Sequence, residues 1–128
     1  MKSYRAEPYR VPVTEGDRIR ADAALHLAAY AFGVPANEML RRERTRPRAC
    51  RARWSAMYLA HVSYGWPLER VGHAFGLNRA TASTACRWAE DARDDDRYDA
   101  VMDGLESGLR AVSELPAVDL ALALGAAR

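Results

Sequence analysis

The chain has 128 residues, 49% of them hydrophobic and 28% charged, and a net charge of +2, which is the size and balance of one globular domain. No apolar stretch is long enough to span a membrane, and the charged, proline-containing start Met1–Pro8 argues against a secretory signal, so we expect a cytoplasmic protein. Two isolated cysteines, Cys50 and Cys86, are too few for a disulfide scaffold or a zinc site and are expected to be reduced thiols.

The first third of the chain predicts a lead segment and two helices. Residues 1–14 show no apolar period and are expected to be extended or disordered. In residues 17–32 apolar side chains recur at helical spacing, and Gly33 suits a left-handed cap at the end of that helix. Pro35 suits the entry to a short second helix over residues 36–42. The predicted buried face of the first helix consists of Leu25, Ala28, Ala29 and Phe32.

Residues 41–53, called the basic segment below, hold seven arginines and one glutamate. Pro47 predicts a loop in its first half, followed by a long helix from about Arg48 to Tyr64, which Gly65-Trp66-Pro67 ends. A cluster of positive charge of this kind is typical of a protein with a polyanionic partner. The residues that recur at helical spacing in the long helix are Trp54, Met57, Tyr58, His61 and Val62.

The second half of the chain predicts three further helices and no strand. Two of them cover residues 68–75 and 79–92, and a sixth follows the acidic run Asp94–Asp96, whose carboxylates favour a helix start. The acids from Glu90 to Glu106 outnumber the arginines by eight to two, so the chain is polarised in charge. We expect the run Asp94–Asp96 to be a solvated helix start and not a metal site. The apolar stripe of the sixth helix is Tyr98, Val101, Met102, Leu105, Leu109 and Val112.

These patterns predict an all-α fold, a compact bundle of about six helices. We place the domain at residues 15–113, after the lead of residues 1–14, and interpret residues 114–128 as a tail that can form a short helix.

Residues 68–89 have the layout of a helix-turn-helix. Gly76 provides the positive φ of the turn, Gly72 lies where the two helices cross closely, and Asn78 is a good N-cap. The face with Ala82, Ala85, Cys86 and Ala89 is expected to point inward. The opposite, outward face then carries short polar residues with arginines at both ends, which suits a DNA major groove. The alternative interpretation is an αα-hairpin of a helical bundle whose outer face is solvated. The outward residues are Arg79, Ala80, Ser83, Thr84 and Arg87.

Over residues 20–96 the sequence resembles the C-terminal DNA-binding domain, domain IV, of the replication initiator DnaA, and small stand-alone bacterial relatives of it. The resemblance rests on three stretches, RARWSAMYLAH from Arg51, LERVGHAFG from Leu68 and Ala85-Cys86-Arg87. It implies an all-helical fold of the DnaA domain IV or Trp-repressor-like kind, in which a basic loop grips phosphates and the helix-turn-helix reads bases.

By position, the resemblance places Arg53 on the arginine that opens the family's long helix, and Asn78, Arg79 and Thr81 in the family's signature. The chain departs from that signature at Leu77, Asn78, Ala80 and Ala82. The predicted phosphate contacts are Arg44, Arg46, Arg48, Arg51 and Arg53. The predicted base contacts are Asn78, Arg79, Ala80, Thr81, Ser83, Thr84 and Arg87.

No phosphate-cradling glycine loop and no supported Ser/His/Asp or Cys/His pairing occurs in the sequence, so we expect no enzyme, no cofactor and no bound metal. The leading hypothesis is a sequence-specific double-stranded DNA-binding protein of the nucleoid that regulates transcription. The resemblance extends this to an activator of gene-transfer-agent or phage-like genes, with RNA polymerase, a sigma-like factor or another DNA-binding protein as partner. The alternatives are a modulator of replication at initiator sites and a protein-interaction module without DNA binding. The sequence leaves the oligomeric state open.

Overall fold

The computed structural model describes residues 13–41, 46–116, 118 and 124–125, and these residues form helices and no strand. The all-α class is therefore as predicted. Within this part of the chain, no helix is long and apolar enough to cross a membrane. The helices are α1 (Glu15–Phe32), α2 (Ala36–Met39), α3 (Pro47–Tyr64), α4 (Leu68–Ala74), α5 (Arg79–Ala92) and α6 (Asp96–Ser113).

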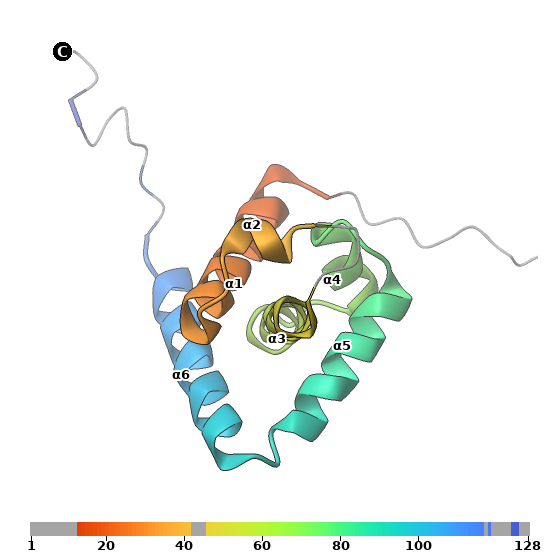
Figure 1. Ribbon diagram of the computed structural model, residues 1–128. Coiled ribbons are helices and arrows are strands. Elements are labelled where there is room, and N and C mark those ends of the chain that lie inside the picture. The colour runs from red at the N-terminus through yellow and green to blue at the C-terminus, as the bar shows by residue number, and fades with distance from the viewer. Residues whose placement is uncertain (1–12, 42–45, 117, 119–123, 126–128) are drawn as a thin grey trace, which may run out of the picture.

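The long helix α3 is the centre of the molecule. Figure 1 looks nearly along its axis, with α1, α4, α5 and α6 arranged around it. Ala56, Leu59 and Ala60 have no exposed surface, and every residue from Ser55 to Ala60 is buried. A helix that is surrounded on all sides has no solvent face over those turns. Of the residues that recur at helical spacing in this helix, Met57 and Tyr58 are buried, whereas Val62 is 41% exposed.

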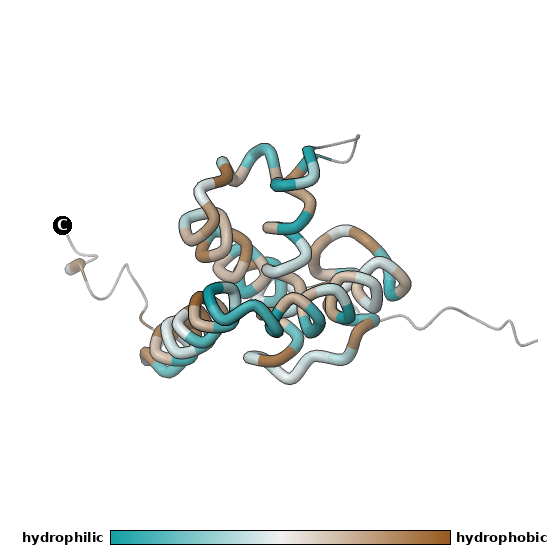
Figure 2. The backbone as a smooth tube through the Cα atoms, turned by 60° about the horizontal axis from the view of Figure 1, so that its bottom comes forward, coloured by the Kyte–Doolittle hydropathy of each residue, from teal (hydrophilic) through white to brown (hydrophobic). Residues whose placement is uncertain are grey.

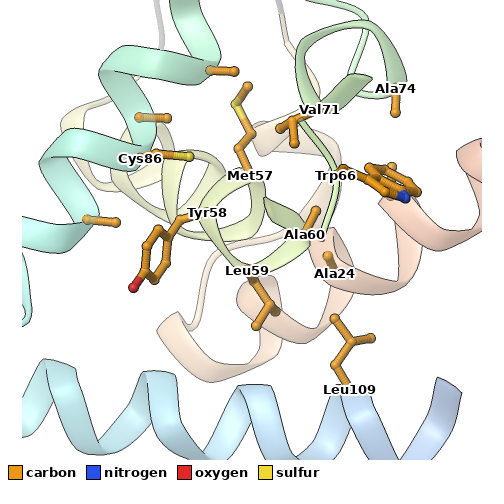
Figure 3. Close-up of a cluster of buried hydrophobic side chains, with 14 of the residues drawn as sticks. Ala24, Met57, Tyr58, Leu59, Ala60, Trp66, Val71, Ala74, Cys86 and Leu109 are labelled. Carbon is orange, nitrogen blue, oxygen red and sulfur yellow. The ribbon is translucent and has the colours of Figure 1, made fainter. Parts of the chain in front are cut away.

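The core fills the space between α3 and its neighbours. Figure 3 shows Met57 of α3 between Val71 of α4 and Cys86 of α5, while Leu59 faces Leu109 of α6 on the other side. All of these side chains except Cys86 are at most 1% exposed, and Cys86 is 7% exposed. The core thus has the helix-turn-helix on one side of α3 and α6 on the other.

The buried strip of α6 is narrower than the sequence predicted. Met102 and Leu109 are buried, but Val101 and Val112, from the same predicted stripe, are 37% and 53% exposed. Figure 2 shows brown and teal bands alternating along this helix. The reason is that α6 packs mainly against α1 and α3, so the buried surface of this helix is a narrow strip.

Helix ends follow the predicted signals with small shifts. The hydroxyl of Thr14 accepts a hydrogen bond from the Asp17 N–H at 3.0 Å, so α1 begins two residues before the predicted start. Gly33 ends it at φ 66°, in the left-handed region as predicted. The second helix was predicted to reach Arg42 but ends at Met39. The predicted tail helix falls largely on residues outside the described part of the chain.

Asp94, Asp95 and Asp96 are exposed at the start of α6, as expected from the sequence, and the acidic residues farther along this helix bind an arginine. Arg93, at the end of α5, donates hydrogen bonds to Asp99 at 2.5 Å, to Glu106 at 2.6 Å and to Asp103. Burial lowers the pKa of this guanidinium, but the hydrogen bonds that it donates to Asp99 and Glu106 outweigh burial and leave the pKa raised. This cluster fixes α6 against the end of α5. Asp95 caps α6, since its carboxylate accepts hydrogen bonds from the backbone N–H groups of the first turn.

The two thiols are free, and their surroundings differ. Burial, with the charge of Glu90, raises the pKa of Cys86 to about 11, whereas Cys50 lies half-exposed near the start of α3. In the native protein, a water-soluble thiol reagent should therefore label Cys50 rapidly and Cys86 only after unfolding, as followed by mass spectrometry. The variant Cys50→Ser is the control. Fast labelling of that variant would contradict the packing of α5.

Candidate functional site

A tight turn joins α4 to α5. Gly76 has φ 75°, as the turn requires, and the Leu77 N–H donates to the Gly72 carbonyl at 2.7 Å. Gly72 is buried where the two helices cross, because a Cβ atom there would lie 2.4 Å from the backbone carbon and oxygen of Asn78. The predicted roles of both glycines are confirmed, and the segment 68–92 is a helix-turn-helix in its backbone geometry.

The first turn of α5 is capped by Asn78, whose side-chain oxygen accepts the Thr81 N–H at 2.9 Å. The inward face is as inferred from the sequence, with Ala82, Ala85 and Ala89 without exposed surface. Because this face carries three alanines and the small side chain of Cys86, α5 can pack closely against α3. The opposite face presents Arg79, Ala80, Thr84 and Arg87 to solvent, with Ser83 and Thr81 half-buried.

The arginines of this outward face have only weak partners. The Nε atom of Arg79 lies 3.6 Å from Glu69 Oε2, and the Arg79 side chain is 62% exposed. Arg87 donates to Ser83 Oγ at 3.2 Å, within one turn of the helix. Exposed contacts of this kind contribute little stability, so both guanidinium groups are free to bind an external acceptor.

Some arginines of the basic segment have hydrogen-bond partners within the protein, and others have none among the described residues. Arg44 lies outside the described part of the chain. Arg46 pairs with Glu38 at 2.9 Å but is 78% exposed. Arg48 donates to the Phe32 carbonyl at 2.9 Å. Arg51 is exposed, and its guanidinium makes no hydrogen bond or ion pair with the described residues. Three arginines near the start of α3 thus present positive charge to solvent.

Arg53 has a structural role that sequence reasoning missed. Its Nη1 atom donates to the carbonyls of Met39 at 3.1 Å and Arg41 at 2.9 Å. Those carbonyls lie where α2 ends, so the guanidinium satisfies acceptors that a longer helix would have used internally. Whether Arg53 also contacts phosphate stays a prediction.

The basic segment lies next to the second half of α5. Trp54 of α3 packs against Trp88 of α5 with ring centroids 5.8 Å apart, which places the first turns of α3 beside the turn that carries Arg87. Figure 1 shows the end of α3 that is nearest the viewer beside α5. The basic segment and Arg87, which are separated in the sequence, are thus carried by neighbouring parts of two packed helices.

A second element that the sequence did not reveal fixes the helix-turn-helix to α1. Asp17 is 2% exposed, and Arg70 of α4 donates to both of its carboxylate oxygens, at 2.6 and 3.1 Å. The hydrogen bond from Arg70 lowers the Asp17 pKa although burial acts to raise it. Arg70 also lies 4.7 Å from the centre of the Trp66 ring. The two partners are 53 positions apart, so no local pattern could indicate the pair.

No family model and no curated protein matches the sequence. Among solved structures, the fold is similar to that of the "crystal structure of DNA replication initiation factor", with a TM-score of 0.64 and 22% sequence identity. The similarity covers 74% of this chain but 29% of the other, so this chain corresponds to less than a third of that protein. At this level of identity the likeness shows a shared helical fold.

Proposed function

We propose that this chain is a sequence-specific double-stranded DNA-binding protein that regulates transcription, and that it is not an enzyme. The observation that carries the proposal is the outward face of α5, held by a helix-turn-helix and lying beside a group of exposed arginines. The shared fold with a protein described as a DNA replication initiation factor supports a DNA partner.

The shape of α5 suits the major groove. Arg79 and Arg87 are eight residues apart on one helix, which corresponds to about 12 Å along its axis. Only short side chains lie between the two arginines, so the backbone of α5 can approach the floor of the groove, which is about 12 Å wide and admits an α-helix. Arginine can bond guanine with two parallel hydrogen bonds, so each end of this face can read a base.

The arginines near the start of α3 suit phosphate contacts. Arg46, Arg48 and Arg51 are exposed and come from one end of the central helix. Contacts to phosphate position a protein on DNA without reading its sequence. Arg53 is a weaker candidate, because its guanidinium already donates to the carbonyls of Met39 and Arg41.

The target is proposed to differ from the initiator's own site. At Ala80, which is exposed, the side chain is too short to form a hydrogen bond with a base. Ala82, a further departure from the resembled signature, has no exposed surface and affects packing against α3 instead. A role in transcription, with RNA polymerase or a sigma-like factor as partner, extends the proposal from the sequence resemblance.

Selection from a pool of random duplexes, read by sequencing, tests the proposal. A new recurring motif is the expected result. Recovery of the initiator's box would favour a modulator of replication. Failure to enrich any sequence, together with no gel shift at low salt, would overturn DNA binding and favour a protein-interaction module.

The two groups of arginine should respond differently to substitution. Arg51→Ala should weaken binding about equally on the selected site and on unrelated DNA, and should lower the dependence of log K on log salt concentration by about 1, because one phosphate contact is lost. Arg79→Ala should cost about 1 to 3 kcal/mol on the selected site and little on unrelated DNA. Fluorescence anisotropy over a range of salt concentrations measures both effects.

Arg110→Ala, at the C-terminal end of α6, is the matched control for charge, and it should change neither the affinity nor the salt dependence. Equal losses for Arg79→Ala on both DNAs would mean that α5 does not read bases in this orientation.

A further inference from the structure

A pocket opens between the ends of four helices, beside the first turns of α3. It has a volume of about 440 Å³, which lies in the range of pockets for small molecules. None of the interactions assigned above to base reading uses it. Its lining is Phe32 from α1, Arg48, Arg51, Ala52 and Ser55 from α3, Trp88 from α5 and Tyr98 from α6.

Aromatic rings form one wall of this pocket. The Phe32 and Tyr98 rings are stacked, with centroids 5.9 Å apart and planes 19° apart, and the Trp88 ring meets Tyr98 edge-on at 5.6 Å. All three side chains are only half-buried. Because the rings brace one another, they offer a fixed apolar surface to a flat ligand at little cost in side-chain entropy.

The polar groups behind the rings already have partners. The Ser55 hydroxyl, on a residue that is 1% exposed, donates to the Arg51 carbonyl at 2.9 Å. Ser55 Oγ lies 2.7 Å from the Tyr98 hydroxyl, which must then be the donor of that hydrogen bond. These hydroxyl groups at the back of the pocket therefore do not need a hydrogen bond from a ligand.

The rim of the pocket, in contrast, has hydrogen-bond donors without partners among the described residues. Arg48 uses one nitrogen on the Phe32 carbonyl, whereas the guanidinium of Arg51 has no hydrogen bond or ion pair with the described residues. A guanidinium carries five N–H donors in a planar fork that matches a carboxylate. Among the lining groups no carboxylate balances the two positive charges. An anion is the ligand group that this rim favours.

We infer that this pocket binds a small aromatic anion, with its ring against Phe32, Trp88 and Tyr98 and its carboxylate on Arg51. The inference rests on the pocket and not on DNA binding. If the proposed function also holds, ligand and DNA compete for Arg51, which makes the pocket a site where a metabolite can weaken DNA binding.

The experiment uses 2-naphthoate as the probe and 2-naphthalenemethanol as its neutral counterpart. Two-dimensional ¹H–¹⁵N NMR follows the protein, with the Trp88 indole signal assigned from the variant Trp88→Phe. Naphthoate should shift that indole signal and the backbone signals of Ser55 and Tyr98 in a saturable way. The neutral alcohol should bind at least about tenfold more weakly, since it lacks the charge-assisted hydrogen bonds.

Two substitutions of exposed arginine test the rim. Arg51→Leu should weaken naphthoate about tenfold or more and leave the alcohol unchanged. Arg110→Leu removes the same charge from α6 and should leave naphthoate unchanged. Arg51 is exposed, so its loss should not unfold the chain, and the amide spectrum verifies this.

Three outcomes would overturn the inference. They are the absence of saturable shifts at the pocket with millimolar naphthoate, equal effects of Arg51→Leu and Arg110→Leu, and shifts of Trp88 produced by duplex DNA but not by naphthoate. The last result would assign the rings to the DNA interface. Because none of the naphthoate measurements involves DNA, loss of the proposed function would not be mistaken for loss of the pocket.

Discussion

Replacing Gly72 with alanine should lower the free energy of unfolding by about 3 kcal/mol, although alanine is the better helix former. The added Cβ would lie 2.4 Å from the carbonyl carbon and oxygen of Asn78 and 2.9 Å from the Arg79 nitrogen. All three are backbone atoms, so no side chain can rotate away to make room. The helices α4 and α5 must separate, and that opens the contact between Val71 and the core.

The matched control is Gly104→Ala in α6, where nothing lies within 4 Å of the added methyl group. This variant should gain up to about 1 kcal/mol, because the helix propensity of alanine acts without a clash. Chemical denaturation of both variants measures the effects. A Gly72→Ala protein as stable as the parent would show that α4 and α5 do not cross as closely as described.

Replacing Asp17 with asparagine should cost about 2 to 3 kcal/mol near neutral pH. The substitution keeps the shape of the side chain but removes its negative charge and replaces one of the two carboxylate oxygens that accept hydrogen bonds from Arg70. Asp17 is almost fully buried, while the Arg70 side chain is 36% exposed and can recover part of its hydration. We therefore expect a smaller loss than for a pair in which both partners are buried. The control is Asp22→Asn, on an exposed residue of the same helix, which should change stability by less than about 0.5 kcal/mol.

The dependence on pH provides a second measurement of the same pair. Arg70 holds the Asp17 pKa in the folded state below the value of an unfolded aspartate, about 3.9. A depressed pKa contributes stability that is fully present above the unfolded value and is lost as the pH falls through the folded one. The difference between the parent and Asp17→Asn should thus be largest near pH 7 and shrink below about pH 4. A difference that stays constant on acidification would assign the loss to packing instead of charge.

The sequence alone was sufficient for elements whose causes are local. Spacing and caps located every helix of the described chain to within a few residues, because helix formation and capping depend on neighbours three or four positions away. The helix-turn-helix was predictable for the same reason. Its turn depends on a positive φ at Gly76 and on the cap at Asn78, which adjoins the helix that it caps. The inward face of α5 followed from its row of small side chains.

Tertiary structure decided what depends on residues far apart in the chain. The spacing of apolar residues could not show that α3 is enclosed on all sides, nor that Val101 and Val112 lie on the open side of α6. Arg51 and Arg53 look equivalent in the sequence. Only the fold brings the carbonyls of Met39 and Arg41 to Arg53 and leaves Arg51 at the rim of an aromatic pocket.

The same distinction explains Asp17 and Arg93, which look like ordinary surface charges in the sequence. Asp17 is buried against Arg70, and Arg93 forms ion pairs with three carboxylates of α6. A long charged side chain can reach several neighbours, and its partner is fixed by which helices pack together. Local sequence therefore determined the helices and the turn that joins α4 to α5. Packing between distant helices determined which arginines hold the fold together and which remain available to a ligand.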